Sequence, residues 1–280
     1  MISAQTRIAG VIGHPIGHSL SPVLMNHWIE ATGLDAAYIA LPAQADLDAA
    51  AIRDLAKTGF AGLNVTLPFK PLALKAADSA SNVARSVGAA NLLLFREGSI
   101  IADNTDVAGA RDALAAAGSG FEGRTVLVLG AGGAAQAICA AAQADGAVRI
   151  LLANRTPERA TKLAARYEGA EFIAWDRRSE ALEIADIVVN ATQLGLDGRS
   201  CPLESWDGAR ADTVAFDTVY SPASRPFLDD ARKAGLTCID GLAMLIGQAR
   251  PSFRQLFDCE VPERVDAETL LRKALADKNV

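Results

Sequence analysis

The chain has 280 residues, which at roughly 150 residues per domain predicts two domains. Half of the residues are hydrophobic and 21% are charged, so the chain can bury a core and is neither disordered nor fibrous. The net charge is −6 and Lys and Arg form no long block, which argues against nucleic acid or an anionic membrane as the main partner.

The cysteine spacing and the N-terminal residues indicate the compartment. Four cysteines lie far apart without a C-x-x-C pair, so neither a disulfide framework nor a zinc site is indicated. The N-terminus lacks the basic start and long apolar stretch of a signal peptide. Residues 125–144 carry no charge and could span a bilayer, but their glycines and glutamines favour a strand, a turn and a helix. We therefore expect a cytoplasmic protein without a membrane span.

In the first hundred residues, short apolar runs alternate with helical patterns. Ile8–Ile12 is a predicted strand, and a helix follows from Pro22 with Ser21 as its N-cap. The next predicted elements are a strand at Ala37–Leu41, a helix at Leu47–Lys57, a strand at Gly62–Leu67, a hairpin of Asn91–Phe95 and Ser99–Ala102, and a helix at Val107–Ala117.

From residue 125 onward, strands and helices alternate strictly. The predicted strands are Val126–Leu129, Arg149–Ala153, Glu171–Ala174, Ile187–Asn190, Thr213–Asp217 and Thr237–Ile239. Helical sequence follows Gly241 to the end, with Pro251 as a break or kink. The expected fold class is α/β with two domains. These are an N-terminal α/β substrate domain over 1–106 and a Rossmann-type doubly wound parallel sheet over 107–239, with C-terminal helices over 240–280 returning to the first domain.

A glycine loop suggests a dinucleotide site. Residues 130–135 read GAGGAA, directly after a predicted strand and before a predicted helix, as in the G-x-G-x-x-[G/A] pattern. Such glycines permit a tight turn and let backbone N–H groups approach a pyrophosphate beside the positive end of the helix dipole. The alternative is an ordinary glycine turn, which this context disfavours.

The tip of the next strand indicates which dinucleotide binds. NAD sites usually place Asp or Glu about 20 residues after the glycines. Here Asn154, Arg155 and Thr156 follow the strand, and Arg159 lies one turn later. Two guanidiniums suit a 2′-phosphate, so NADP is the predicted cofactor. Alternatively, both arginines belong to a solvated helix face.

The loop after the first strand carries two hydroxyls, Ser19 and Ser21. They could bind a polyol or a carboxylate through paired hydrogen bonds, or Ser21 could only cap the helix. All three histidines fall in the same stretch, but a proline and a glycine between the first two exclude the helix that a metal-binding i, i+4 spacing needs. We therefore expect no metal site.

The segment from residue 63 to residue 70 resembles the lining of a pocket. In a strand, Asn64 and Thr66 face one side, and a turn fixed by Pro68 then carries Lys70. A lysine there can donate a proton. Asp106, just before a predicted helix, could hold the ammonium in place, or it could be a simple N-cap. The alternative for the segment is a half-exposed edge strand with a solvated lysine.

Together these segments resemble the shikimate dehydrogenase family over almost the full chain. The motifs that carry the resemblance are HSLSP (18–22), NVTLPFK (64–70), GAAN (88–91), NTD (104–106), GAGGAA (130–135), NRTPER (154–159), NAT (190–192), DTVYSP (217–222) and GLAMLIGQA (241–249). Members of that family reduce 3-dehydroshikimate to shikimate with NADPH, on the route to aromatic amino acids.

The resemblance also implies roles for individual residues. Lys70 and Asp106 would be the catalytic pair. The other substrate-binding residues would be Ser19, Ser21, Asn64, Thr66, Asn91, Tyr220 and Gln248. NADP would contact Gly130, Ala131, Gly132, Gly133 and Ala134, with Asn154, Arg155, Thr156 and Arg159 around the 2′-phosphate and Thr218 and Gly241 beside the nicotinamide. The chain departs from residues common in the family at Leu20, Leu92, Ala102, Val107 and Thr218, none of which is assigned to proton transfer.

Two other functions remain as alternatives. A quinate or quinate/shikimate dehydrogenase is the related one, although Ser21 and the Asn154-Arg155 pair favour shikimate and NADP. A catalytically silent shikimate-binding sensor is the other, although it would be expected to lack the Lys70 and Asp106 pair. The expected partner is a small-molecule substrate, and the expected state is a monomer or a homodimer.

Overall fold

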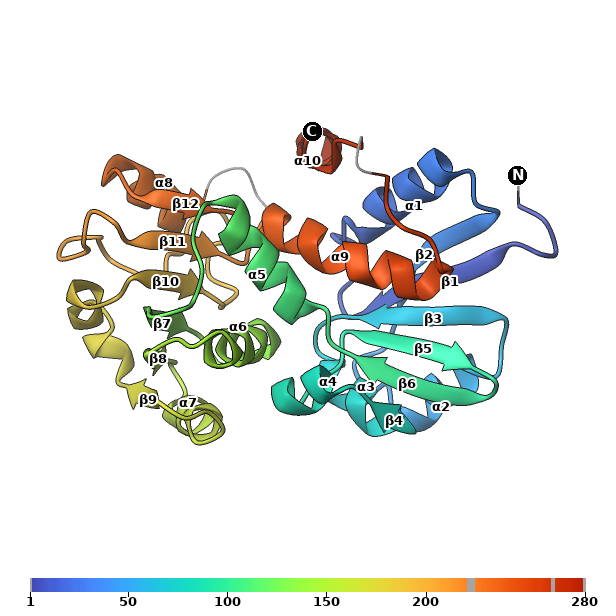
Figure 1. The fold of residues 1–280 in the computed structure, drawn as a ribbon, viewed down its shortest axis with the longest axis horizontal. Coiled ribbons are helices and arrows are strands. Elements are labelled where there is room, and N and C mark those ends of the chain that lie inside the picture. Colours follow the sequence, from blue (N-terminus) through green and yellow to red (C-terminus); the bar gives the residue numbers. More distant parts are fainter. Residues whose placement is uncertain (1, 221–224, 263–264, 279–280) are drawn as a thin grey trace. The chain divides into compact units, whose positions relative to one another are not determined.

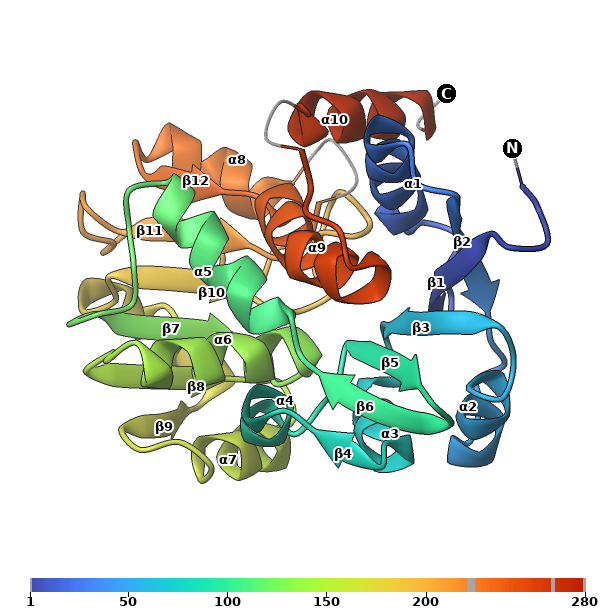
Figure 2. The same cartoon turned by 45° about the vertical axis from the view of Figure 1, so that its right-hand side comes forward.

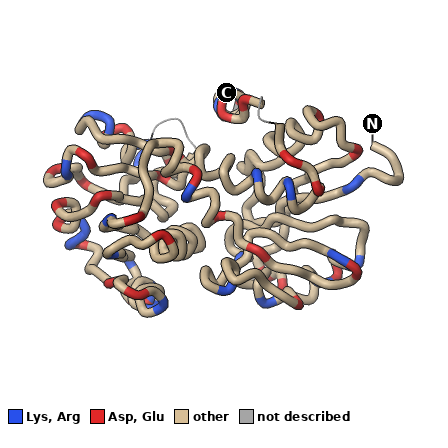
Figure 3. The backbone as a smooth tube through the Cα atoms, viewed as in Figure 1, with Lys and Arg blue, Asp and Glu red and all other residues tan. Residues whose placement is uncertain are grey.

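The computed structural model describes residues 2–220, 225–262 and 265–278, and the chain divides into two compact units. Unit 1 comprises Met1–Asp106 and Gln248–Ala274, and unit 2 comprises Val107–Gly247 and Leu275–Val280. Each unit contains one six-stranded sheet with its own helices (Figure 1). Acidic and basic residues are interspersed along the chain in both units (Figure 3). Within the described residues, no helix has the length and apolar character that a membrane span requires.

The sheet of unit 1 is mixed, with the strand order β2-β1-β3-β5-β6-β4. Its strands are β1 (Arg7–Gly13), β2 (Ala36–Pro42), β3 (Phe60–Val65), β4 (Ser79–Ala80), β5 (Leu92–Arg96) and β6 (Ser99–Asp103). β1 pairs in parallel with β2 and β3, whereas β5 is antiparallel to β3 and β6. The predicted hairpin is therefore confirmed, with its turn at residues 97 and 98, both of which have positive φ.

β3 is a central strand, so the alternative of a half-exposed edge strand is wrong. Leu63 and Val65 pack into a core with residues of α2 (Ala49–Leu55) and α3 (Lys70–Ala76). Gly62 lies on the opposite face, where a Cβ would meet the side chain of Leu256 on α9 (Gly241–Phe257) at 2.8 Å. Since side chains alternate along a strand, Asn64 shares the α9 face with Gly62.

Helix α1 (Ser21–Thr32) begins one residue earlier than predicted. The N-cap is Leu20, which has helical backbone angles and makes no side-chain cap bond, so Ser21 is not the cap. Leu20 is fully buried, and apolar packing therefore fixes this helix start. By contrast, Asp48 and Ser81 do cap α2 and α4 (Asn82–Val87) through their side chains.

Unit 2 has an all-parallel sheet with the order β12-β11-β10-β7-β8-β9. Its strands are β7 (Thr125–Leu129), β8 (Arg149–Ala153), β9 (Ala170–Ile173), β10 (Ile187–Asn190), β11 (Val214–Asp217) and β12 (Thr237–Ile239). Counted within the unit, this is the 3-2-1-4-5-6 order of the Rossmann fold. The predicted α/β fold with a Rossmann-type sheet is confirmed, and each predicted strand lies within two residues of the observed one.

The helices of unit 2 connect and cover these strands. α6 (Gly133–Ala144) and α7 (Pro157–Ala164) pack against β7, β8 and β9, and α8 (Pro226–Lys233) packs against β11 and β12 (Figure 2). Other helical pieces of the unit are α5 (Asp106–Ala116) from Val107 onward, η1 (Trp175–Arg177), η2 (Glu180–Glu183) and the start of α9 up to Gly247. The uncharged stretch of residues 125–144 thus forms β7, the glycine loop and α6, as predicted.

The C-terminal segment forms two helices rather than one continuous one. α9 runs through Pro251 without ending there, so of the predicted break or kink the break is absent, and the helix stops at Phe257 before a residue with positive φ, Asp258. α10 (Ala267–Lys278) follows. From Gln248 onward α9 belongs to unit 1, where the ring of Phe253 lies edge-on to Trp28 of α1 at 5.7 Å.

Candidate functional site

Four loops of unit 1 meet at one edge of its sheet. β1 and β3 run in parallel and both end there, at the register pair Ile12 and Val65. β5 is antiparallel to β3 and therefore begins there, and β6 ends there, with Leu92 opposite Asp103. The directions of the four strands therefore place the loops that carry the polar motifs at the same edge of the sheet.

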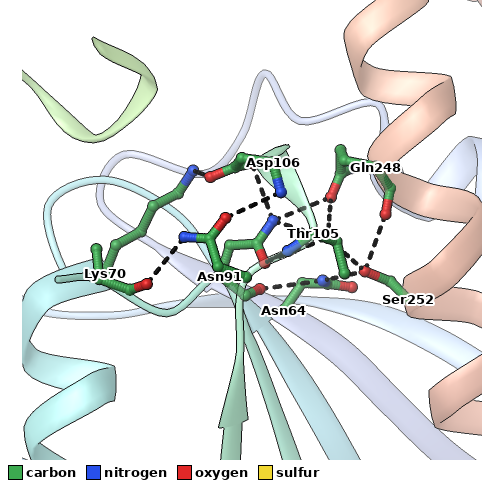
Figure 4. Close-up of polar contacts among 9 residues, drawn as sticks. Asn64, Lys70, Asn91, Thr105, Asp106, Gln248 and Ser252 are labelled. Atoms are coloured by element: carbon green, nitrogen blue, oxygen red, sulfur yellow. Dashed lines mark hydrogen bonds and ion pairs between the residues drawn. The ribbon is translucent and has the colours of Figure 1, made fainter. Parts of the chain in front are cut away.

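Lys70 and Asp106 are in contact at this edge (Figure 4). Lys70 is the first residue of α3 and Asp106 the first of α5, and Nζ lies 2.6 Å from Oδ2. Their side chains are only 15% and 8% exposed, so the two opposite charges compensate each other where little water reaches them. The pairing hypothesised from the sequence is therefore present in the structure.

Two asparagines orient Asp106. Asn91 Nδ2 donates to Asp106 Oδ1 at 2.9 Å, and Asn104 Oδ1 accepts from the backbone N–H of Asp106 at 3.0 Å. Asn91 Oδ1 in turn accepts from the backbone N–H of Thr105 at 2.7 Å, which fixes the amide with its NH₂ toward Asp106. The N-cap alternative for Asp106 is wrong, because Asp106 is the first residue of α5 rather than the residue before it, and its carboxylate oxygens bind Lys70 and Asn91.

The cluster includes Gln248, which the resemblance implied, and three residues that the sequence analysis did not assign to the site. Gln248 Oε1 lies 3.3 Å from both Asn91 Nδ2 and Thr105 Oγ1. Thr105, Ser252 and Tyr38 complete the cluster through buried hydroxyls. Thr105 lies within the NTD motif and Ser252 stands one helical turn after Gln248, so their positions in the sequence weakly indicate that they belong to the site. Nothing in the sequence indicates Tyr38.

Asn64, Ser19, Ser21 and Thr66 lie at the same sheet edge. Asn64 is buried at the end of β3, with Nδ2 3.0 Å from Ser252 Oγ (Figure 4). Thr66 follows β3, and its methyl group abuts Gly13 at the end of β1. Ser19 lies in the loop after β1, and its Oγ accepts from the backbone N–H of Ser21, the first residue of α1, at 3.3 Å. The structure therefore brings the predicted substrate residues of unit 1 to one edge.

The glycine loop of unit 2 joins β7 to α6. Gly130 has a φ of +117°, and a Cβ there would lie 2.6 Å from the backbone oxygen of Ala191, so only glycine fits. Gly132 is the N-cap of α6, and a Cβ there would meet nothing within 4 Å. The loop thus presents open space at the N-terminus of a helix that begins at Gly133 and includes Ala134, which suits a pyrophosphate.

The tip of β8 carries two exposed guanidiniums. Asn154 Nδ2 donates to the backbone oxygen of Thr156 at 2.9 Å and so shapes the turn into α7. Arg155 and Arg159 are exposed, and no ion pair is found for either within the described part of the chain. The donor set at this tip therefore fits a dinucleotide that carries a 2′-phosphate.

The predicted nicotinamide and substrate residues of unit 2 follow its last two strands: Thr218 and Tyr220 come after β11, and Gly241 comes after β12. A Cβ on Gly241 would lie 2.5 Å from the backbone oxygen of Thr218, so the start of α9 packs directly on that residue. Thr218 Oγ1 donates to the backbone oxygen of Asn190 at 2.9 Å. Tyr220 lies three residues after β11, and the last two residues of the DTVYSP motif lie outside the described residues.

A buried carboxyl lies at the end of β11. Asp217 Oδ1 accepts from Asn190 Nδ2 at 2.9 Å and from the backbone N–H of Val219 at 3.0 Å. Oδ2 has no hydrogen-bond partner within the described residues. Burial raises the pKa of Asp217 to about 7, so this carboxyl is largely protonated below neutral pH.

The departures from the family pattern lie mostly in the interior. Leu20, Leu92, Ala102 and Val107 are all buried, so they fill core space and add no polar group to the cluster. Among the residues that the structure describes, no group of three or more His, Cys, Asp or Glu side chains is placed to hold a metal ion.

Comparison with known proteins supplies the family context. The model of the shikimate dehydrogenase substrate binding domain matches residues 11–93, and the model of shikimate / quinate 5-dehydrogenase matches residues 113–195. The shikimate dehydrogenase (NADP(+)) of Maricaulis maris is 46% identical over 269 residues, which cover 96% of each chain.

Two solved structures resemble the fold along most of its length. The shikimate 5-dehydrogenase of Thermus thermophilus, in complex with NADP(H) and shikimate, has a TM-score of 0.86 at 35% identity and covers 96% of this chain and 100% of its own. The 5-ketofructose reductase of a Gluconobacter strain, in a ligand-free form, has a TM-score of 0.85 at 30% identity and covers 97% of this chain and 100% of its own.

Proposed function

Because the chain belongs to the shikimate dehydrogenase family, we propose that it catalyses the NADP-dependent, reversible reduction of 3-dehydroshikimate to shikimate. This reaction is a step of the shikimate pathway to aromatic amino acids. The observation that carries the proposal is the 2.6 Å contact between Lys70 Nζ and Asp106 Oδ2 within a buried cluster of amides.

Lys70 is the proton donor of the proposed reaction. In the reduction, the ketone carbon gains a hydride and its oxygen gains a proton. The ammonium of Lys70 gives that proton, and the neutral amine that remains is the base for the reverse reaction. Asp106 holds the ammonium in one place, and it is held itself by Asn91, so the donor is oriented before substrate arrives.

The polar edge of unit 1 suits a small, polyhydroxylated acid. The amides of Asn64, Asn91 and Gln248 offer donors and acceptors to ring hydroxyls, and the hydroxyls of Ser19 and Ser21 suit a carboxylate. Thr66 and Tyr220 complete the proposed substrate set. A substrate rich in hydroxyls is favoured because an analogue without them would leave the remaining hydrogen-bonding capacity of these buried groups unused.

Unit 2 holds the cofactor in this proposal. Gly130, Ala131, Gly132, Gly133 and Ala134 would contact the pyrophosphate, and Thr218 and Gly241 would lie beside the nicotinamide. The 2′-phosphate would be bound by Asn154, Arg155, Thr156 and Arg159, of which both arginines are exposed. When bound, NADPH supplies the hydride.

The test is a four-way assay of the purified protein. Shikimate or quinate is offered with NADP or NAD, and reduced nicotinamide is followed by absorbance. We expect turnover mainly with shikimate and NADP. A preference for quinate would overturn the substrate assignment, and a preference for NAD would overturn the cofactor assignment. Binding of shikimate without turnover in any mixture would favour the silent sensor.

Substitution of Lys70 tests the mechanism. Lys70→Ala should lower kcat by about 10²- to 10⁴-fold, the usual contribution of a positioned acid or base, while the Kd for shikimate changes far less. The matched control is Lys75→Ala, which removes an exposed lysine from the same helix and should leave kcat unchanged. A near-normal rate in Lys70→Ala would remove Lys70 from its role.

A further inference from the structure

The side-chain amide of Asn64 is hydrogen-bonded at both of its polar atoms by buried groups. Nδ2 donates to the backbone oxygen of Asn91 at 3.1 Å and to Ser252 Oγ at 3.0 Å. Oδ1 accepts from the hydroxyl of Tyr38 at 2.8 Å. These contacts come from three separate elements, namely α9, β2 and the residue before β5.

The orientation of this amide follows from its partners. A backbone oxygen can only accept, so the atom of Asn64 that faces Asn91 must be the NH₂ group. Both of its hydrogens are then used, one by Asn91 and one by Ser252. Oδ1 accepts one hydrogen bond, from Tyr38, and a carbonyl oxygen has two lone pairs. The oxygen is therefore the atom of Asn64 with capacity for a further partner.

Tyr38 and Ser252 are suited to hold the amide because neither is solvated. Tyr38 is 1% exposed and Ser252 is fully buried, so a lost hydrogen bond at either one would not be replaced by bulk water. Burial also holds the pKa of Tyr38 well above its ordinary value, so its hydroxyl stays a donor through the physiological range.

Ser252 also links Asn64 to the rest of the cluster. Its Oγ lies 3.0 Å from Thr105 Oγ1 and donates to the backbone oxygen of Gln248 at 3.1 Å (Figure 4). Gln248 Oε1 and Thr105 Oγ1 are 3.3 Å apart. One buried hydroxyl therefore joins α9, β3 and the loop that leads to Asp106.

We propose that Tyr38 and Ser252 are positioning residues that hold Asn64 with its oxygen as the binding atom, so that this position accepts a hydrogen bond from a substrate hydroxyl. The inference deepens the proposed function and rests on it, since that function supplies the polyhydroxylated substrate. It predicts that both residues act on substrate affinity through Asn64, and not on proton transfer.

The experiment measures shikimate affinity by calorimetry and kcat by absorbance in Tyr38→Phe, Ser252→Ala and Asn64→Ala. Each of the first two variants should raise the Kd for shikimate about three- to tenfold, as expected for one lost buried hydrogen bond, with kcat within about twofold. In an Asn64→Ala background, Tyr38→Phe should alter the Kd by less than about twofold, because the residue that its hydroxyl contacts is gone. Ser252→Ala should have a smaller effect there than in the wild type, since only its contacts with Gln248 and Thr105 remain.

The control is Thr213→Val, which removes another fully buried hydroxyl, one that donates to the backbone oxygen of Ala185 in unit 2. It should lower the Tm without changing the Kd for shikimate. An unchanged Kd in Tyr38→Phe would overturn the inference even if Ser252→Ala fails to fold. The inference would also be overturned if Tyr38→Phe raised the Kd as much in the Asn64→Ala background as in the wild type. If the wild-type protein binds shikimate and the variants change its Kd as expected, but the wild-type protein shows no turnover, the proposed function is overturned and this inference stands.

Discussion

The buried carboxyl of Asp217 should make the stability of the protein depend on pH. Its pKa is raised to about 7 from an ordinary 3.8, chiefly by burial, with the Val219 N–H, Arg225 and Asn190 lowering it and Asp240 raising it. Oδ2, which has no partner within the described residues, is the oxygen for which a negative charge would be most costly. We therefore expect the folded protein to keep Asp217 neutral in mild acid.

The sign and size of the effect follow from linkage. Because the pKa is higher in the folded than in the unfolded chain, the stabilisation is fully present below about pH 3.8 and is lost as the pH rises to about 7. At 1.36 kcal/mol per pKa unit, the loss over this window is about 4 kcal/mol. Asp217→Asn stays neutral throughout, so wild type should lose about this much stability relative to the variant between pH 4 and pH 7.

The assay is urea unfolding followed by circular dichroism at several pH values in both proteins. A matched control is Asp212→Asn: its hydrogen bond from Arg210 lowers the pKa of that exposed carboxyl below 3.8, so its stability should differ from wild type by a constant amount between pH 4 and pH 7 and change only in stronger acid. Parallel curves for wild type and Asp217→Asn would refute the reasoning, because they would show that Asp217 does not titrate differently in the folded and unfolded chain.

Two further predictions concern the cofactor unit. Arg155→Ala should weaken NADP binding far more than NAD binding, as measured by calorimetry, because only NADP has a 2′-phosphate for the guanidinium; equal weakening would contradict that assignment. Gly130→Ala should lower the free energy of unfolding by about 3 kcal/mol, since its Cβ would meet a backbone oxygen at 2.6 Å and its φ is +117°. Gly132→Ala, with open space at its Cβ, should unfold at nearly the wild-type urea concentration, and an equal loss in both would argue against this steric account.

The sheet of unit 2 could be predicted closely because its strands carry their own signal. Parallel strands buried on both faces appear as apolar runs such as Val126–Leu129, bounded by glycine and helical patterns. The start of α1 could not, because tertiary packing of Leu20 fixes it rather than the capping chemistry of Ser21. The end of β3 also came earlier than predicted, at Val65, since alternation alone does not show where pairing stops.

Within the candidate site, the sequence alone indicates the ionisable residues that lie beside predicted strand ends. Lys70 and Asp106 stand out because an isolated lysine and carboxylate beside strand ends suggest proton transfer. The contacts that orient them depend on distance in space: Asn64 and Ser252 are separated by 188 positions in the chain and meet only because α9 covers the face of β3. Tyr38 has the pattern of an ordinary strand tyrosine, and only its 2.8 Å contact with Asn64 distinguishes it.

The two segments that make up unit 1 have a consequence for synthesis on the ribosome. The sheet of unit 2 is complete in the nascent chain once Ile239 has emerged, whereas unit 1 still lacks Gln248–Ala274 at that point. Until then Trp28 has no Phe253 ring against it, and Asn64 has no Ser252. Since domains generally fold as units during translation, unit 1 is expected to be completed only after the sheet of unit 2 has formed. A chain that stopped before residue 248 would contain all the residues proposed to bind the cofactor, but its substrate site would be incomplete.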